Sequence, residues 1–352
     1  GTGADSIDGL GLAALAPATV EASVTVDNYA AASLTGDSRL VRMDATHYTL
    51  DLGTATQGAS ALTASLAALN SASGQADWLD GSYLLGGGAG FSNTGFAAFS
   101  GLAAGSQGGA GSISLATDTA GSFSETLTLD PTGANASGFA AALAPEILTV
   151  TGTIAPSGTA WGDVHMVTFD GLHYDFQATG DFLLAQSTRA GNSFLIQIHA
   201  DPLPALGAVS VTTQVAARLG SDRVTFDLDR PDLVLLNGAA DDLATGASQQ
   251  LSGGSLSHLA DGSYRMQWIT GESLTLTDQG QWFDLATALG PDDGPGSVRG
   301  LLGANSGQAN DLQLADGTVL PIPVDDSELL GAFADAWRVS GRALLLDPAT
   351  PP

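Results

Sequence analysis

The stretch WGDVHMVTFDGLHYDF, residues 161–176, contains two apolar-rich runs separated by a single dipeptide. The runs are His165–Phe169 and Leu172–Phe176, and the dipeptide is Asp170-Gly171. A two-residue turn of type I′ needs positive φ at both central residues, and Asp-Gly tolerates it. The sequence therefore predicts a β-hairpin with a fixed register. Its cross-strand pairs are Phe169 with Leu172, Val167 with Tyr174, and His165 with Phe176.

The predicted hairpin has two unlike faces, because side chains alternate along a strand. One face must be covered by other parts of the protein, and it carries Phe169, Val167, Leu172, Tyr174 and Phe176. The other face can stay partly wet, and it carries Met166, Thr168, His173 and Asp175.

These residues, followed by GDFLLAQ at 180–186, resemble the opening of a von Willebrand factor type D (VWD) domain. Three further blocks match in order: GLLGANSGQANDL at Gly300–Leu312, LADGTVL at Leu314–Leu320, and FADAWRVS at Phe333–Ser340. The resemblance covers about half of the chain. It implies a β-rich module of a secreted or surface protein, usually inside a larger structural, adhesive or matrix protein. It does not imply an enzyme.

The first half of the chain consists of short alternating runs rich in Gly, Ala, Ser and Thr. We expect strands at 48–52, 61–70, 112–115, 123–129 and 147–154, with turns at Gly86-Gly87-Gly88 and at 130–133. This pattern is typical of an antiparallel β-sandwich. The order of motifs such as YTLDLGT, GSFSETLTL and ILTVTGTI resembles the immunoglobulin-like choice-of-anchor D modules of bacterial surface proteins.

The phrase AALAP occurs twice, at residues 13–17 and 141–145, an offset of 128 residues. A repeat of this length indicates duplication of a whole domain. We therefore expect residues 1–28 to hold the closing strand of a preceding repeat, or a strand donated to a neighbouring copy. In the second case the segment 19–26 would pair with another sheet edge and build a head-to-tail filament.

We predict an all-β chain in four parts. Residues 1–28 form the segment just described, residues 29–157 an Ig-like β-sandwich, residues 158–346 a VWD-like domain, and residues 347–352 a Pro-rich tail. The break at 156–159 is expected to act as a short linker. The VWD-like strands are expected at 182–186, 194–199, 208–216, 223–228, 233–236, 263–268, 273–277 and 281–285. One short helix is expected near 327–337, because Asp325 and the acidic residues after it suit a helix start.

The chain has 10 basic and 37 acidic residues, a net charge of −27, and no Lys or Cys. This acidity disfavours nucleic acid and anionic lipid as partners, and it attracts divalent cations. No apolar run approaches the ~18 residues of a membrane-spanning helix, so we expect no membrane insertion. Since animal VWD domains are rich in disulfides, the lack of Cys excludes covalent multimerisation and suits an exported bacterial protein. No signal peptide is visible, and we expect the sequence to be part of a longer protein.

The VWD resemblance implies a Ca²⁺ site where the hairpin turn meets the Gly/Asn-rich loop near the end of the domain. Carried over to this sequence, the ligands are Asp170, Asn305 through its backbone carbonyl, Ser306, Asn310 and Asp311. Carboxylate, amide, hydroxyl and carbonyl oxygens suit Ca²⁺, which takes six to eight of them. Family loops usually have Asn at the position of Ala304, so one ligand is missing here. The alternative is that Asp170 is only a turn residue and 303–307 only a loop.

No constellation for catalysis stands out. The five His show no metal-binding spacing, and the chain has neither GxSxG nor a Cys nucleophile. Some family members cleave themselves at Gly-Asp-Pro-His, but here Val164 replaces the Pro. We therefore predict that the protein is not an enzyme and does not cleave itself between Asp163 and Val164.

The predicted function is a structural or adhesive segment of a large secreted bacterial protein of the cell surface or extracellular matrix. Its partners would be copies of itself or other surface and matrix proteins. The alternative is a carbohydrate- or protein-binding module of a surface adhesin. Trp78, Tyr83 or Trp282 on a flat open face would favour glycan binding, whereas their burial would favour a scaffold.

Overall fold

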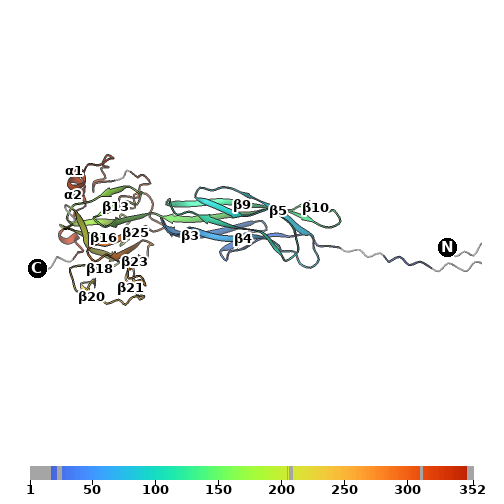
Figure 1. Ribbon diagram of the computed structural model, residues 1–352, viewed down its shortest axis with the longest axis horizontal. Helices are drawn as coiled ribbons and strands as arrows, with labels where there is room; N and C mark the ends of the chain where they lie inside the picture. Colours follow the sequence, from blue (N-terminus) through green and yellow to red (C-terminus); the bar gives the residue numbers. More distant parts are fainter. Residues whose placement is uncertain (1–16, 22–25, 204, 206–208, 310–311, 347–352) are drawn as a thin grey trace, which may run out of the picture.

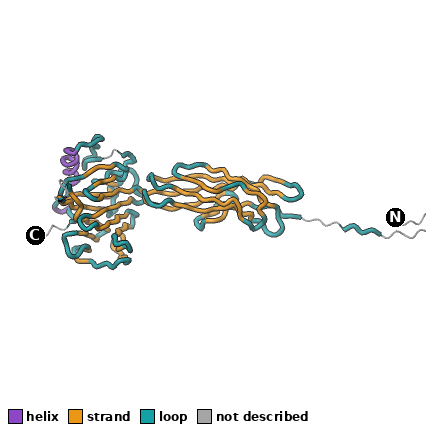
Figure 2. The backbone as a smooth tube through the Cα atoms, viewed as in Figure 1, coloured by secondary structure: helices purple, strands orange, loops and turns teal. Residues whose placement is uncertain are grey.

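The computed structural model describes residues 17–21, 26–203, 205, 209–309 and 312–346. Strands dominate this part of the chain and form two β-sandwiches that follow one another along the long axis of the molecule (Figures 1 and 2). The all-β prediction is confirmed. No helix within these residues is both long and apolar enough to cross a membrane.

The first sandwich is built from two sheets. In spatial order, one contains β1 (Ala32–Gly36), β4 (Leu62–Asn70), β8 (Gln107–Leu115) and β6 (Phe91–Gly95). The other contains β2 (Leu40–Arg42), β3 (His47–Thr56), β11 (Glu146–Ala155), β9 (Gly121–Ala134), β5 (Trp78–Leu85) and β7 (Phe99–Leu102), with β10 (Ala140–Ala142) beside β9. Alternate residues such as Leu50, Ile113 and Leu148 point inward and are fully buried, as the period of a strand requires.

Two features of this sandwich differ from the prediction. Strand β11 runs parallel to β3, so the sheet is mixed rather than purely antiparallel. The expected turn at 130–133 is instead part of β9, with Pro131 paired opposite Gly81. Pro131 fits because it falls in a gap on its other side: pairing with β11 ends at Leu129, and pairing with β10 starts at Thr132. Because no strand pairs with Pro131 on that side, the missing N–H of the proline breaks no ladder hydrogen bond there.

The second sandwich is larger. In spatial order, one sheet contains β14 (His173–Asp175), β13 (His165–Val167), β12 (Ser157–Trp161), β25 (Phe283–Ala288), β24 (Ser273–Asp278), β23 (Tyr264–Trp268), β22 (Gly254–His258) and β21 (Ser248–Leu251). The other contains β20 (Ala239–Ala240), β19 (Val234–Leu236), β18 (Asp222–Asp227), β17 (Ser210–Leu219), β16 (Leu195–Pro202), β15 (Gly180–Ser187) and β26 (Val298–Arg299).

The predicted short helix is present near the end of the chain. It is made of α1 (Asp326–Glu328), the π-helical turn η2 (Leu329–Phe333) and α2 (Ala334–Trp337), and the 3₁₀ turn η3 (Gly341–Ala343) follows. The Asp325 side chain caps its start, because Oδ1 accepts from the backbone N–H of Ser327 at 2.8 Å. Phe333 is fully buried and meets Phe176 edge to face, with ring centroids 6.2 Å apart. The helix therefore closes the core over the hairpin.

The predicted linker at 156–159 is wrong in extent. Strand β11 ends at Ala155 and β12 begins at Ser157, so only Pro156 lies between the sandwiches. Ser157 and Thr159 pair with β25, and the N–H of Leu289 donates to the carbonyl of Pro156 at 3.0 Å. Residues 157–159, which the sequence suggested were linker, are thus part of a strand in the second sandwich.

The two predicted end segments lie mostly outside the described residues. The tail at 347–352 lies wholly outside, and the strand expected at 19–26 includes residues 22–25, which are not described. Of the described part, Val20 and Val26 are 89% and 85% exposed. Asn28 makes a parallel bridge to Ala76, where the chain enters the first sandwich.

Candidate functional site

The hairpin at 165–175 exists, but its turn is not the predicted type I′ turn. The observed pairs are His165 with Asp175, Met166 with Tyr174, and Val167 with His173. The N–H of Gly171 donates to the carbonyl of Thr168 at 2.9 Å, and Gly171 alone of the central dipeptide has positive φ, +81°. A three-residue loop, with a type I turn followed by a left-handed glycine, needs only one such residue. Asp170 can therefore keep a right-handed backbone while its side chain reaches outward.

This shift of one residue exchanges part of the two faces. Met166 and Thr168 are buried at 1% and 0% exposure, whereas Val167 is half-buried, the reverse of the prediction. Phe169 and Phe176 are buried as predicted. The cause is the extra loop residue, which moves the β13 side chains relative to those of β14.

The Asp170 carboxylate joins the turn to a loop 136 residues later in the chain. Its Oδ2 accepts from the backbone N–H of Ser306 at 2.8 Å, and its Oδ1 accepts from that of Gly307 at 2.8 Å. The Ser306 hydroxyl lies 3.4 Å from Oδ2. Hydrogen bonds to an ionised carboxylate are short and strong, so this contact fixes the loop to the turn. We call it the Asp170 dock.

Contacts beside the dock hold the same two segments together. The N–H of Phe169 donates to the carbonyl of Leu302 at 3.0 Å, and the Tyr174 hydroxyl donates to that of Leu301 at 2.6 Å. Burial raises the pKa of Tyr174 well above its usual value, so this hydroxyl keeps its proton.

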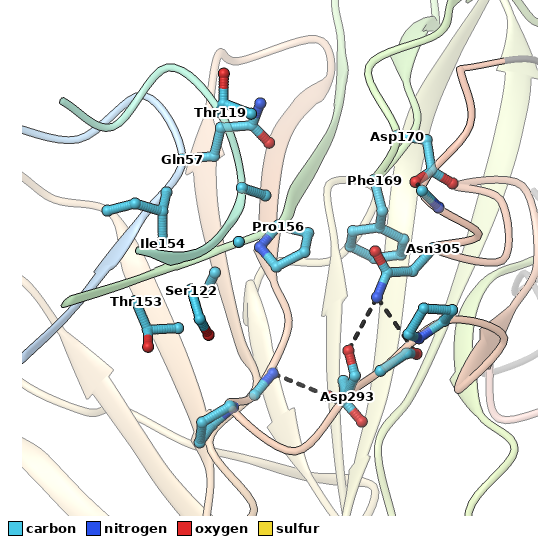
Figure 3. Close-up of a pocket in the computed structure, with 18 of the residues that line it drawn as sticks. Gln57, Thr119, Ser122, Thr153, Ile154, Pro156, Phe169, Asp170, Asp293 and Asn305 are labelled. Carbon is cyan, nitrogen blue, oxygen red and sulfur yellow. Dashed lines mark hydrogen bonds between the residues drawn. The ribbon is translucent and has the colours of Figure 1, made fainter. Parts of the chain in front are cut away.

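The five predicted metal ligands are only partly brought together. Asp170 and Ser306 are in contact. The backbone carbonyl of Asn305, the predicted ligand atom, accepts from the N–H of Gly296 at 3.3 Å, while its side-chain Nδ2 donates to the carbonyl of Asp293 at 2.9 Å (Figure 3). Asn305 is 8% exposed and has a φ of +53°, which suits an Asn in a tight loop. Asn310 and Asp311 lie outside the described residues. Across the described positions, no group of three or more His, Cys, Asp or Glu is arranged to hold a metal ion.

A cavity of about 540 Å³ separates the two sandwiches next to the dock (Figure 3). The first sandwich lines it with Gln57, Thr119, Ser122 and Thr153, and the second with Phe169, Asp170, Asn305 and the loop 290–295. The cavity, the dock and the one-residue connection at Pro156 together form the joint between the sandwiches.

Two His, each held between two Asp, were missed by the sequence reasoning. His165 contacts Asp163 through Nε2 and Asp175 through Nδ1. His199 lies 2.6 Å from Asp181 and 3.2 Å from Asp201. A spacing of two along a strand, as in His199 and Asp201, places both side chains on one face, and this signal could have found the second pair.

The surroundings of His199 favour its charged form. Burial lowers the pKa of His199, but the hydrogen bond to Asp181 and the negative charges of Asp201 and Asp181 outweigh it, so the pKa is raised. His199 therefore forms ion pairs with Asp181 and Asp201, and His165 joins Asp163 to Asp175 by close polar contacts. Neither lines the cavity at the joint.

The segment that resembles a self-cleavage sequence has an unusual backbone. Val164 is 1% exposed and has a φ of +50°, a region that β-branched residues rarely enter. Proline fixes φ near −65° and could not replace Val164 without rebuilding this turn. The departure from Gly-Asp-Pro-His is therefore structural as well as chemical.

Residues 158–318 match the family model of the von Willebrand factor type D domain. Human Mucin-4 is 28% identical over 220 residues, which is 55% of this chain and 4% of that protein. Human Sushi domain-containing protein 2 is 29% identical over 201 residues, which is 53% of this chain and 24% of that protein. The chain thus spans a small part of both relatives.

The residues that match the VWD family model, 158–318, thus lie in the second sandwich, and they include no cysteine. VWD domains are found in secreted and extracellular proteins such as mucins, and they are typically non-catalytic.

Proposed function

We propose that this chain is a non-catalytic structural or adhesive segment of a secreted bacterial surface or matrix protein. The observation that carries the proposal is the end-to-end arrangement of two sandwiches with Pro156 alone between them (Figure 1). A connection this short limits how far the two domains can swing. Such a segment transmits force and sets the spacing between its neighbours.

Contacts across the joint support this role. The N–H of Gln57 donates to the carbonyl of Ala155 at 2.9 Å, and the Ser157 hydroxyl donates to the carbonyl of Gln57 at 3.4 Å. The loop of the first sandwich that holds Gln57 therefore contacts both sides of Pro156. The net charge of −27 keeps such a segment soluble and apart from anionic surfaces.

Two measurements test the proposal. Antibodies against the chain should label intact, unpermeabilised cells of its host, and small-angle scattering of the purified chain should give an elongated particle. A Gly-Ser-Gly-Ser insertion after Pro156 should let the two sandwiches bend relative to each other and so widen the distribution of particle dimensions. The same insertion after Gly262, at an exposed turn, should leave that distribution unchanged. Label confined to the cell interior, or a particle in which the sandwiches fold back on each other, would refute the role.

We further propose that copies of the chain associate head to tail. Val20 and Val26 are almost fully exposed, yet they stand 128 residues before Leu148 and Ile154, which are fully buried in β11. If this segment paired with a sheet edge of another copy, the two Val side chains would be buried, which is energetically favourable. Val20→Asp should abolish concentration-dependent association in sedimentation experiments, whereas Glu21→Gln should not. A wild-type chain that stays monomeric at all concentrations would exclude this assembly.

Calcium binding at the Asp170 dock is a third proposal. Asp170 and Ser306 offer too few oxygens for Ca²⁺ alone, so the site needs Asn310 and Asp311 as well. Addition of Ca²⁺ should raise the melting temperature, and Asp311→Asn should remove the rise. An unchanged melting temperature in Ca²⁺ and in chelator would leave the dock as a metal-free contact.

The alternative function, glycan binding, has one supporting observation. Trp78, the first residue of β5, is 44% exposed. Tyr83 packs instead against the first core, and Trp282 is half-buried with its Nε1 donating to Asp284 at 3.0 Å. Binding to a glycan array that Trp78→Ala removes would favour this alternative over a scaffold.

A further inference from the structure

An exposed tryptophan lies on the outer face of the sheet that contains β12. Trp161 is the last residue of β12 and is 38% exposed. On one side it pairs with His165 of β13. On the other side lies β25, where Asp284 accepts from the N–H of Gly162 at 3.1 Å. Trp161 therefore stands between an imidazole and a carboxylate on the solvent-facing side of the sheet.

The Trp161 ring is held in place from the side of β13. The ring centroids of Trp161 and His165 lie 5.7 Å apart, with an angle of 42° between the planes. His165 is itself held by its contacts with Asp163 and Asp175. A side chain that is already fixed loses little conformational entropy when a ligand binds to it. Trp161 is thus a prepared aromatic surface.

An open cavity of about 320 Å³ lies on the side of Trp161 that faces β25 and β24. Its polar lining consists of Asp284 and three outward-facing Thr side chains, Thr159, Thr275 and Thr277. The hydroxyls of these Thr residues make no hydrogen bond to any residue that the structure describes, so they are available to a ligand. Small-molecule sites in proteins measure about 300–1,000 Å³, so the cavity suits a ligand of one or two rings.

The Asp284 carboxylate is fixed as a hydrogen-bond acceptor at the edge of this cavity. Its Oδ1 accepts from the N–H of Gly162 at 3.1 Å and from Nε1 of Trp282 at 3.0 Å. Its Oδ2 accepts from Nε2 of Gln279 at 2.7 Å. A carboxylate has about four acceptor positions, so one position on Oδ2 is left for a donor from a ligand.

This combination of groups fits a neutral sugar ring. A pyranose has a face of C–H groups that can lie on an aromatic ring, and hydroxyls around its edge that both donate and accept. Acidic sugars and phosphates are disfavoured, because the chain has a net charge of −27 and no Lys, and no Arg lines this cavity among the described residues. A cationic ligand would find one carboxylate whose acceptor positions are mostly filled.

We propose that the face around Trp161 binds a neutral sugar ring of a polysaccharide, which stacks on Trp161 and hydrogen-bonds to Asp284 and the three Thr hydroxyls. An exposed aromatic side chain on an open sheet face is the observation that favours glycan binding. Trp161 provides it, although the sequence pointed to Trp78, Tyr83 and Trp282. The inference rests on the adhesive form of the function proposed above, since a pure scaffold needs no such site.

The first test applies the full chain to an array of oligosaccharides. Neutral oligomers of glucose, mannose and galactose should include at least one ligand, and Trp161→Ala should weaken its binding about tenfold or more. Trp78→Ala is the matched control, because Trp78 is a similarly exposed tryptophan in the first sandwich, and it should bind as the wild type does. Binding that Trp161→Ala retains, binding to sialylated or uronic-acid glycans alone, or no binding to any neutral oligomer would overturn the proposal.

The second test uses wild-type protein labelled with ¹⁵N-tryptophan. Each of the five Trp gives one indole N–H signal, and the Trp161 signal is the one that disappears in Trp161→Phe. Titration with the same neutral oligomers should move the Trp161 signal and leave that of Trp78 in place. A Trp161 signal that does not move would contradict the proposal. Particle shape and cell-surface labelling do not depend on this face, so the scaffold role and the sugar site can fail separately.

Discussion

Replacing Asp170 with Ala removes the two hydrogen bonds that dock the hairpin turn on the loop 306–307. A hydrogen bond to a charged group contributes about 1.5–3 kcal/mol. Both contacts are only part-buried or exposed, so the lower part of that range applies. We expect the free energy of unfolding to fall by about 3–4 kcal/mol in total. Asp170→Asn keeps one acceptor oxygen and should lose about half as much.

The assay is urea unfolding followed by tryptophan fluorescence, because four of the five Trp lie in the second sandwich. Asp242→Ala removes the same charge from an exposed position and serves as the control. Hydrogen exchange at Ser306 and Gly307 should accelerate in Asp170→Ala alone. If Asp170→Ala and Asp242→Ala unfold at the same urea concentration, the dock does not hold the loop and the reasoning is wrong.

Three further predictions concern the second sandwich. Phe333→Ala should cost about 3–5 kcal/mol in urea unfolding, because Phe333 is fully buried against Phe176; a loss under about 1 kcal/mol would mean that the helix does not close this core. His199→Gln should lower the free energy of unfolding at about pH 5.5 but not at about pH 9, because the raised pKa of His199 stabilises the fold only while the ring is charged; an equal loss at both pH values would contradict this. The wild-type chain should stay intact in mild acid, and a fragment that begins at Val164 on N-terminal sequencing would show the opposite.

Much of the fold could be predicted because it depends on local patterns. Strand alternation located β3, β9 and β11, and the acidic cap at Asp325 located the helix. The hairpin was found from Asp170-Gly171, but its register was missed by one residue. Asp-Gly is compatible with both a two-residue and a three-residue loop, so the dipeptide alone does not determine the register of the hairpin.

Other features could not be read from the sequence because they depend on pairing between distant residues. Pro131 predicts a turn, but the structure accommodates it in β9 because neither β10 nor β11 pairs with it. Ser157 and Thr159 look like linker until β25 pairs with them. Strands β20 to β22 were missed because their short polar runs lack strong alternation.

The candidate site was also predicted only in part. The resemblance indicated the hairpin turn and the later loop, and the structure joins Asp170 to Ser306 there. The resemblance did not predict that the Asn305 side chain donates a hydrogen bond to the loop 290–296.

The most direct test of the account is the distance between the two sandwiches in solution. The chain has no Cys, so one cysteine at Ser82 on β5 and one at Ser248 on β21, both exposed, can carry spin labels without competition. Pulsed electron–electron double resonance should give one narrow distribution of distances between the two spin labels. The Gly-Ser-Gly-Ser insertion after Pro156 should widen this distribution. A distribution that is already broad in the uninterrupted chain would show that Pro156 and the contacts around it do not hold the sandwiches in line.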